Sequence, residues 1–156
     1  MIRIGAYTNI QDNTIITEAL PKEDEDHDGS VVIGNCVTIG HSCLIKGATV
    51  ESYSLIGMKT ILDERSYVES EAIVAAGSVV PKGFRIPSRQ IWGGNPVKYI
   101  RELSEEELEF IRKSAENYKK NAALHNDQFF LPFGTQWKEA EALGFGDIIG
   151  YRKIDF

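Results

Sequence analysis

The sequence predicts an all-β solenoid, a parallel β-helix, followed by one α-helix and an extended tail. Two observations predict the solenoid: an aliphatic residue recurs every six residues from Ile4 to Ile86, and glycine follows several of these residues. A capped amphipathic segment after residue 103 predicts the helix. A period of six fits neither a helix nor a hairpin meander. It fits short strands joined by corners, three to a coil, with one aliphatic side chain from each strand in a triangular core.

The hexapeptide repeat occupies residues 1–90 and is interrupted by an insertion and by one five-residue step. Its aliphatic positions are Ile4, Ile10, Ile16, Ile33, Ile39, Ile45, Val50, Ile56, Leu62, Val68, Val74, Val80 and Ile86. Since Ile, Leu and Val make up 36 of the 156 residues, an aliphatic residue at all 13 positions is not chance. Stacked coils build continuous ladders, so an uncovered first coil would expose its core. We therefore expect a partner, or a further segment ahead of Met1, to cover it.

Glycine follows the aliphatic residue at Gly5, Gly34, Gly40 and Gly57. We expect a tight corner at each position, with φ values that side chains disfavour. The [Ile/Val/Leu]-Gly-x4 form resembles known left-handed β-helices. The left hand is implied by that resemblance and not by the spacing, because ordinary crossovers between parallel strands are right-handed.

An acidic segment, residues 18–30, interrupts the repeat and must loop out of the prism. A run this charged is more often a solvated loop than a chemical site. After Ile86, residues 91–103 are a Gly/Pro connector in which Gly93-Gly94-Asn95-Pro96 forms a corner that ends the prism.

A helix is predicted over residues 104–124. Ser104 is a good N-cap, and Glu107 three residues later completes a capping box. An apolar stripe at 3–4 spacing contains Leu108, Ile111, Ala115, Tyr118 and Ala122. The pairs Glu109/Lys113 and Glu116/Lys120 have i,i+4 spacing. We expect this helix to pack on one face of the prism, or at an edge between protomers.

Residues 125–156 are an aromatic-rich C-terminal arm. Its aromatic residues are Phe129, Phe130, Phe133, Trp137, Phe145, Tyr151 and Phe156. Too few aliphatic residues surround them for an independent core. Either the arm folds back on its own prism or it docks on a partner.

Composition excludes several classes of protein. The net charge of −6 and the lack of a long basic run give no support to nucleic-acid binding. No stretch approaches the roughly 20 apolar residues of a membrane span, so we expect no transmembrane segment. Cys36 and Cys43 lack CxxC spacing, which favours a reducing compartment and a role as small core residues. His27 and His125 have no ligand partners at useful spacing, so we expect surface roles.

Several segments together carry a family resemblance over residues 1–124. They are Thr8-Asn9-Ile10-Gln11-Asp12-Asn13, Val37-Thr38-Ile39-Gly40-His41-Ser42, Ile56-Gly57-Met58, Val74-Ala75-Ala76-Gly77-Ser78-Val79-Val80, Ile86-Pro87-Ser88, Trp92-Gly93-Gly94-Asn95-Pro96 and Leu103-Ser104-Glu105-Glu106-Glu107. At this spacing they resemble the γ-class carbonic anhydrases, especially the carbonic-anhydrase-like subunits of mitochondrial respiratory complex I. The Gly-Asn-Pro corner alone is weak, because many hexapeptide acyltransferases share it.

The resemblance implies where a metal site would lie. In active members of the family, three histidines bind zinc between adjacent protomers of a trimer. A catalytic zinc needs three such ligands and one open position, so that bound water ionises near neutral pH. The matching positions here hold Thr17, His41 and Lys46. Threonine is a poor zinc ligand, and an ammonium has no lone pair to give. A site built by this chain alone should therefore be inactive.

The family pattern places the first and third ligands on one protomer, while the second reaches the neighbour's site. His41 is then the ligand donated in trans, and Thr17 and Lys46 are the degenerate pair in cis. We expect this chain in a heterotrimer, with His41 completing a zinc site on a homologous subunit; an inherited polar interface residue is an equally open interpretation. Lys46 is expected to pair with a carboxylate. Asn9 and Gln11 match residues that line the family's cleft, although stacked coils also favour amides at corners.

Three functions follow from these features. The first is a non-catalytic structural subunit of a heterotrimer in respiratory complex I, attached through membrane-arm subunits to the matrix side of the mitochondrial inner membrane. It would bind no cofactor alone and would share zinc only at a subunit interface. The second is an active zinc γ-carbonic anhydrase that hydrates carbon dioxide. The third is a hexapeptide acyltransferase with His41 as general base.

Overall fold

The computed structural model describes residues 1–20 and 28–129, and the chain divides into two compact units, Met1–Tyr118 and Lys119–Phe156. The first unit contains three sheets. Sheet A consists of β1 (Ile2–Ile4), β4 (Val31–Ile33), β7 (Thr49–Val50), β10 (Tyr67–Val68) and β13 (Arg85–Ile86). Sheet B consists of β2 (Asn9–Ile10), β5 (Thr38–Ile39), β8 (Leu55–Ile56), β11 (Ile73–Val74), β14 (Gln90–Gly93) and β15 (Lys98–Glu102). Sheet C consists of β3 (Ile15–Thr17), β6 (Leu44–Lys46), β9 (Ile61–Leu62) and β12 (Val79–Val80).

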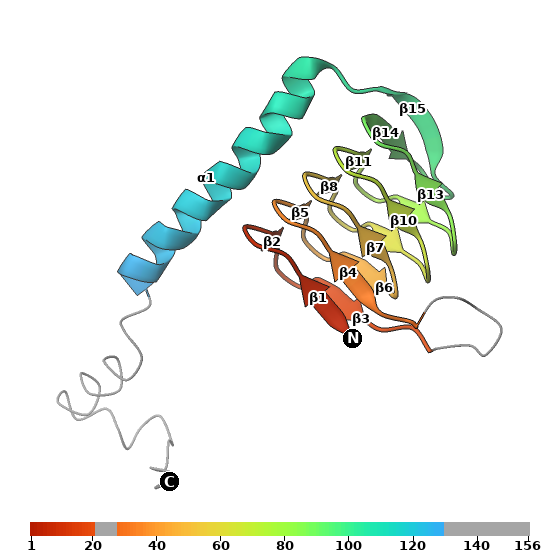
Figure 1. The fold of residues 1–156 in the computed structure, drawn as a ribbon, viewed down its shortest axis with the longest axis horizontal. Helices are drawn as coiled ribbons and strands as arrows, with labels where there is room; N and C mark the ends of the chain where they lie inside the picture. Colours follow the sequence, from red (N-terminus) through yellow and green to blue (C-terminus); the bar gives the residue numbers. More distant parts are fainter. Residues whose placement is uncertain (21–27, 130–156) are drawn as a thin grey trace, which may run out of the picture. The chain divides into compact units, whose positions relative to one another are not determined.

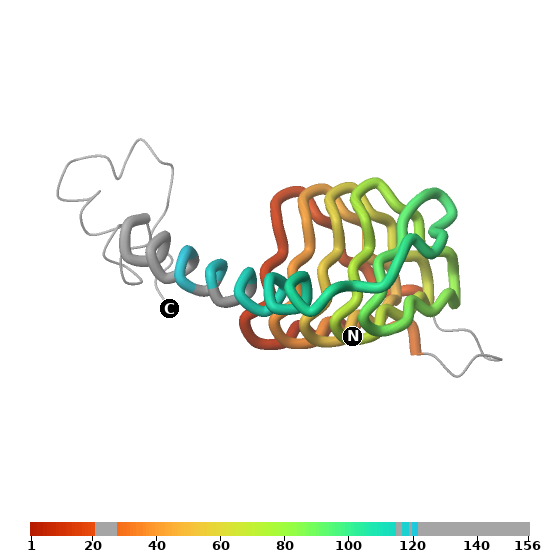
Figure 2. Tube along the Cα trace, turned by 90° about the horizontal axis from the view of Figure 1, so that it is seen from above, coloured from red at the N-terminus to blue at the C-terminus, as the bar shows by residue number. Residues whose placement is uncertain are grey.

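The three sheets form the faces of a left-handed parallel β-helix, which confirms the predicted fold. Within each sheet, every strand up to β14 pairs in parallel with the strand one coil away (Figure 1). Figure 2 shows the coils stacked one beside the next. Because successive coils are in register, residues at the same place in the repeat stack on one another along each face. This register positions the candidate site.

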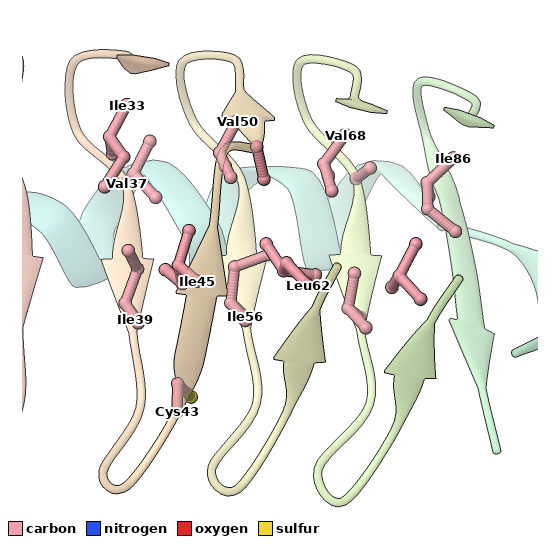
Figure 3. Close-up of a cluster of buried hydrophobic side chains, with 14 of the residues drawn as sticks. Ile33, Val37, Ile39, Cys43, Ile45, Val50, Ile56, Leu62, Val68 and Ile86 are labelled. Carbon is pink, nitrogen blue, oxygen red and sulfur yellow. The ribbon is translucent and has the colours of Figure 1, made fainter. Parts of the chain in front are cut away.

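The aliphatic ladder forms the core, as the period predicts. Ten of its positions, from Ile33 to Ile86, are buried (Figure 3). The three positions of the first coil are less covered, and Ile4 is 50% exposed, because no strand covers the free edge of β1 among the described residues. A second inward position, two residues before the aliphatic one, holds small buried side chains, of which only Cys43 was predicted from the sequence. These are Val31, Val37, Cys43, Ala48, Ser54, Thr60, Ser66, Ala72 and Ser78. The core role was wrong for Cys36, which is half-buried at a corner with φ of 55°.

The glycine prediction was wrong in its physical reason. Gly5, Gly34, Gly40 and Gly57 do not have positive φ. Instead, a Cβ at Gly57 would lie 2.4 Å from the backbone nitrogen of Ala76 in the next coil, and the other three glycines are equally crowded. The left-handed backbone falls at the corners, most often on residues with side chains: Tyr7, Asn13, Cys36, Ser42, Tyr53, Lys59, Arg65, Glu71 and Arg89. Glycine is therefore required by close coil stacking and not by backbone conformation.

The C-terminal end of the prism differs from the expected irregular connector. β14 continues sheet B in parallel with β11, and β15 then pairs with β14 in the antiparallel direction. The register of the coil persists because the carbonyl of Trp92 accepts a hydrogen bond from the Ala75 N–H. The Trp92 ring packs edge-to-face with Phe84 and with Tyr99. These rings cover the last coil of the core.

The helix, α1 (Glu105–Phe129), starts at the predicted cap and runs further than expected. The Ser104 N–H donates to the Glu107 carboxylate at 3.0 Å, and the Glu107 N–H donates to the Ser104 hydroxyl at 3.3 Å, which confirms the capping box. Leu108 and Ile111 are buried with Leu103 against the outer side chains of sheet B. The first part of α1 therefore packs on sheet B.

The remaining predictions concern the helix ion pairs, the insertion and the C-terminal arm. Lys113 pairs with Glu109 at 2.7 Å, as predicted. The insertion leaves the coil after β3 and returns before β4, and the Ala19 N–H donates to the Gly29 carbonyl at 2.9 Å at its base. Four predictions lie outside the described residues and side chains. They concern His27, the side chain of His125, the Glu116/Lys120 pair and the aromatic arm. In the part of the chain that is described, α1 lacks the apolar length needed to cross a membrane.

Candidate functional site

Thr17 and Lys46 lie side by side on the outer face of sheet C. β3 and β6 pair in parallel, and their register makes these two residues Cα partners. The Gly47 N–H donates to the Thr17 carbonyl at 2.9 Å and continues the same ladder. The structure thus brings together the two positions at which the family resemblance places the ligands in cis.

Lys46 is held by a carboxylate from the next coil. Its ammonium lies 2.7 Å from the Glu64 carboxylate, whose other oxygen is 3.3 Å from the Lys82 ammonium. Hydrogen bonds from Lys46 and Lys82 lower the pKa of Glu64 from its ordinary value of 4.5 to about 2. Glu64 in turn raises the pKa of Lys46. The predicted pairing of Lys46 with a carboxylate is present, and it keeps the ammonium protonated.

His41 lies at the corner where the chain passes from sheet B to sheet C. The next residue, Ser42, takes the left-handed backbone of the turn with φ of 58°. The imidazole Nδ1 is 3.7 Å from an Asp12 carboxylate oxygen, and the two side chains are 47% and 88% exposed. No hydrogen bond or ion pair joins His41 to Thr17 or Lys46 within the described ranges. The third predicted position is thus separate from the other two within one chain.

Asn9 and Gln11 lie on either side of Ile10 on the outer side of sheet B, and Gln11 contacts α1. The Gln11 side-chain amide donates to the Tyr118 hydroxyl at 2.9 Å. The Asn9 amide nitrogen is buried and has no hydrogen-bond partner among the described side chains. Sequence reasoning assigned Tyr118 to the apolar stripe of the helix. A hydroxyl in that stripe was the one signal that this position differs from its neighbours.

The donor set on sheet C does not fit zinc. Zinc ligands must offer a lone pair, and the Lys46 ammonium offers none while Glu64 holds it in the charged state. A dication beside it would also be repelled. In the described residues, no group of three or more His, Cys, Asp and Glu side chains could hold a metal ion. The Thr17/Lys46 pair of a single chain therefore cannot hold a catalytic zinc.

Comparisons with known proteins agree with the fold. The chain is 45% identical over 127 residues to mitochondrial γ-carbonic anhydrase 2 of Arabidopsis thaliana, covering 80% of this chain and 44% of that protein. It is 41% identical over 128 residues to protein YrdA of Escherichia coli, covering 81% of this chain and 69% of that protein. The chain spans about half the length of the plant relatives it matches.

A solved structure has the same fold. A hexapeptide transferase family protein from Anaplasma phagocytophilum matches with a TM-score of 0.66 and 39% identity, covering 74% of this chain and 63% of that one. No protein-family model matches the chain.

The stacked hexapeptide coils define the hexapeptide-repeat β-helix class. Within that class, the chain belongs to the γ-carbonic-anhydrase-like family.

Proposed function

We propose that this chain is a non-catalytic structural subunit of a trimer built with homologous γ-carbonic-anhydrase-like subunits. One observation carries the proposal: the pair of stacked positions on sheet C holds Thr17 and a Lys46 ammonium fixed by Glu64. The Lys46 ammonium, paired with Glu64, occupies a ligand position with a group that has no lone pair for a metal. In this proposal the fold and its outer surface serve assembly, while the metal site that the family has at Thr17 and Lys46 is not used in this chain.

His41 has the complementary task in this proposal. Within the described ranges it makes no hydrogen bond or ion pair with Thr17 or Lys46, and its imidazole is half exposed. With Nδ1 turned toward Asp12, the other ring nitrogen is left for a neighbour, and a carboxylate near the first nitrogen is the usual orienting partner of a metal-binding histidine. His41 would thus complete a zinc site on a neighbouring subunit that retains both of its own histidines.

Exposed aliphatic side chains support an assembly surface at the same place. Ile15 on β3 and Ile61 on β9 point outward from sheet C, and both are exposed. β3 carries Thr17, and β9 pairs with β6, which carries Lys46. Met58 occupies the equivalent corner position one coil away from His41 and is also exposed. A subunit with the same coil spacing would match this row of side chains and cover it.

The names of the relatives guide the cellular assignment. Three plant relatives, 42–45% identical, are mitochondrial γ-carbonic anhydrases. We propose that this chain lies in mitochondria, on the matrix side of the inner membrane, as part of respiratory complex I. Its attachment would run through homologous subunits and the membrane arm.

Co-expression tests this function. The full chain, tagged, is expressed with a homologous subunit that has histidines at the positions matching Thr17 and Lys46. Native mass spectrometry should find a mixed trimer, and zinc analysis should find bound metal. His41→Gln should remove one zinc ion for each copy of this chain in the trimer, because one ligand is lost.

The control is His125→Gln, the same chemical change at a histidine without predicted ligand partners. It should leave the zinc content unchanged. Zinc that survives His41→Gln would disprove the donation in trans. Failure to form any mixed assembly would disprove the structural role.

A second candidate, an active γ-carbonic anhydrase, is favoured by the names of the same plant relatives. Stoichiometric zinc and carbon dioxide hydration by the purified chain would establish it. The acyltransferase alternative has weaker support, since the matching acetyltransferase structures are 19–24% identical and share the fold alone. Binding of acetyl-CoA in a calorimeter would revive it.

A further inference from the structure

A groove of about 350 Å³ lies on the outer face of sheet A, away from the sheet-C ladder. Val32 and Thr49, on β4 and β7, line its apolar part, and Glu51 and Tyr67 lie along it. Gly34 leaves part of the lining without a side chain, because a Cβ there would lie 2.6 Å from the Ser52 nitrogen. Close stacking of the coils therefore requires glycine at this point of the lining.

Glu51 provides a carboxylate that no cation contacts directly within the described residues, although the Arg85 guanidinium, which pairs with Glu69, also attracts it through space. Its oxygens accept hydrogen bonds from the Tyr67 hydroxyl and, at 2.9 Å, from the Ser70 N–H, but it makes no salt bridge within the described residues. Glu69, one coil further on, accepts the equivalent hydrogen bond from the Ser88 N–H and also pairs with Arg85 at 2.5 Å. The same structural motif is thus neutralised in one coil and left negative in the coil that lines the groove.

Tyr67 adds an aromatic surface to this carboxylate. The Arg85 guanidinium carbon lies 4.5 Å from the centre of the Tyr67 ring. In sheet A, β13 with Arg85 lies on one side of β10, and β7 and β4 with the groove lie on the other. A cation in the groove would therefore meet the side of Tyr67 opposite Arg85, where aromatic rings attract positive charge.

We propose that this groove binds a lysine or arginine side chain of a partner polypeptide. The alkyl stem would lie on Val32 and Thr49, and the charged end would reach Glu51 and the Tyr67 ring. A charge-assisted hydrogen bond to a carboxylate is about twice as strong as a neutral one. The groove is open and lies on a broad sheet face, so a free amine would bury little surface, whereas a polypeptide can add contacts on either side.

The test is a titration of the full isotope-labelled chain followed by NMR. The probes are blocked Gly-Lys-Gly and Gly-Arg-Gly peptides and, as a neutral match, blocked Gly-(Nε-acetyllysine)-Gly. Both cationic peptides should shift the amide signals of Glu51, Ser52 and Ser70 in a saturable way at low salt, and the stronger one identifies the preferred side chain. The acetylated peptide should not.

Matched variants separate charge from structure. Glu51→Gln removes the charge and should weaken binding about tenfold; the amide oxygen can still accept from the Ser70 N–H while the amide NH2 donates to the Tyr67 hydroxyl. Glu69→Gln, which removes a carboxylate already paired with Arg85, should change binding by less than about twofold. Equal shifts with the acetylated peptide, no shifts at the groove, or binding unaffected by Glu51→Gln would each overturn the proposal.

Discussion

At Lys46, an ammonium group lies where a zinc ligand would need a neutral nitrogen, and Glu64 accepts its hydrogen bond. Lys82 contacts the same carboxylate from the other side, so one anion joins two cations across adjacent coils. The network is partly exposed to solvent. Its contribution should therefore be modest and should depend on pH.

The pH dependence follows from Glu64. Its pKa falls from 4.5 to about 2 on folding, so the folded state binds fewer protons than the unfolded state between these values. The stabilisation is present above about pH 4.5 and is lost as the pH falls toward 2. Glu64→Gln should lower the free energy of unfolding at pH 6, and the difference from the native chain should shrink between pH 4.5 and 2.

Urea unfolding at several pH values measures this difference. Glu106→Gln is the control, since Glu106 makes no ion pair among the described residues. Its effect should vary little over the same range. A Glu64→Gln effect that is equally large at pH 6 and pH 2 would refute the assignment of the network to Glu64.

Gly57 tests the reason for glycine in the repeat. A Cβ at this position would lie 2.4 Å from the Ala76 nitrogen, so Gly57→Ala must push two coils apart. We expect a loss of about 1–3 kcal/mol in unfolding free energy. The reverse change on the coil above, Ala75→Gly, should cost only about 0.5–1 kcal/mol. If Gly57→Ala were neutral in a thermal or urea melt, close stacking would not be the reason.

At the scale of the element, the docking of α1 depends on a few apolar contacts. Leu108 is buried against Ile73 and Ile91 of sheet B, whereas Phe110 on the same helix is 64% exposed. Leu108→Ala should reduce the unfolding free energy by about 2–5 kcal/mol. Phe110→Ala should change it by less than about 0.5 kcal/mol. Similar losses for both variants, measured by urea unfolding, would mean that α1 does not dock through this face.

The six-residue repeat and the capping box made the strands and the helix predictable, because each depends on residues close together in the sequence. The aliphatic ladder from Ile33 to Ile86 and the Ser104 capping box are where the pattern places them. The left-handed corners were not predictable from residue type, since tight hydrogen-bonded turns impose positive φ on residues such as Tyr53. The β14/β15 pair was missed because its Gly/Pro-rich sequence is also typical of a loop.

The candidate site was predictable in its positions but not in its contacts. The resemblance identified Thr17 and Lys46, and the register of β3 and β6 makes them neighbours. Glu64 could not be identified as the partner of Lys46, because which corner side chains meet depends on how each coil stacks on the next. The same holds for Tyr118, whose contact with Gln11 joins residues far apart in the chain.

Over the whole molecule, the three faces of the prism differ in what they offer a partner. Sheet B is covered by the first part of α1. Sheet C carries the Thr17/Lys46 ladder beside exposed aliphatic residues, and sheet A carries the groove at Glu51. Within residues 1–20 and 28–129, one face of the prism is covered by a helix and two are not, an arrangement that suits the proposed subunit held between neighbours.

The most direct measurement is the carbon dioxide hydration rate and zinc content of the full purified chain, with native mass determined on the same sample. With Thr17 and Lys46 in place, we expect no stoichiometric zinc and a hydration rate equal to the buffer's. A self-assembled trimer that carries one zinc per chain and hydrates carbon dioxide would contradict the proposed function.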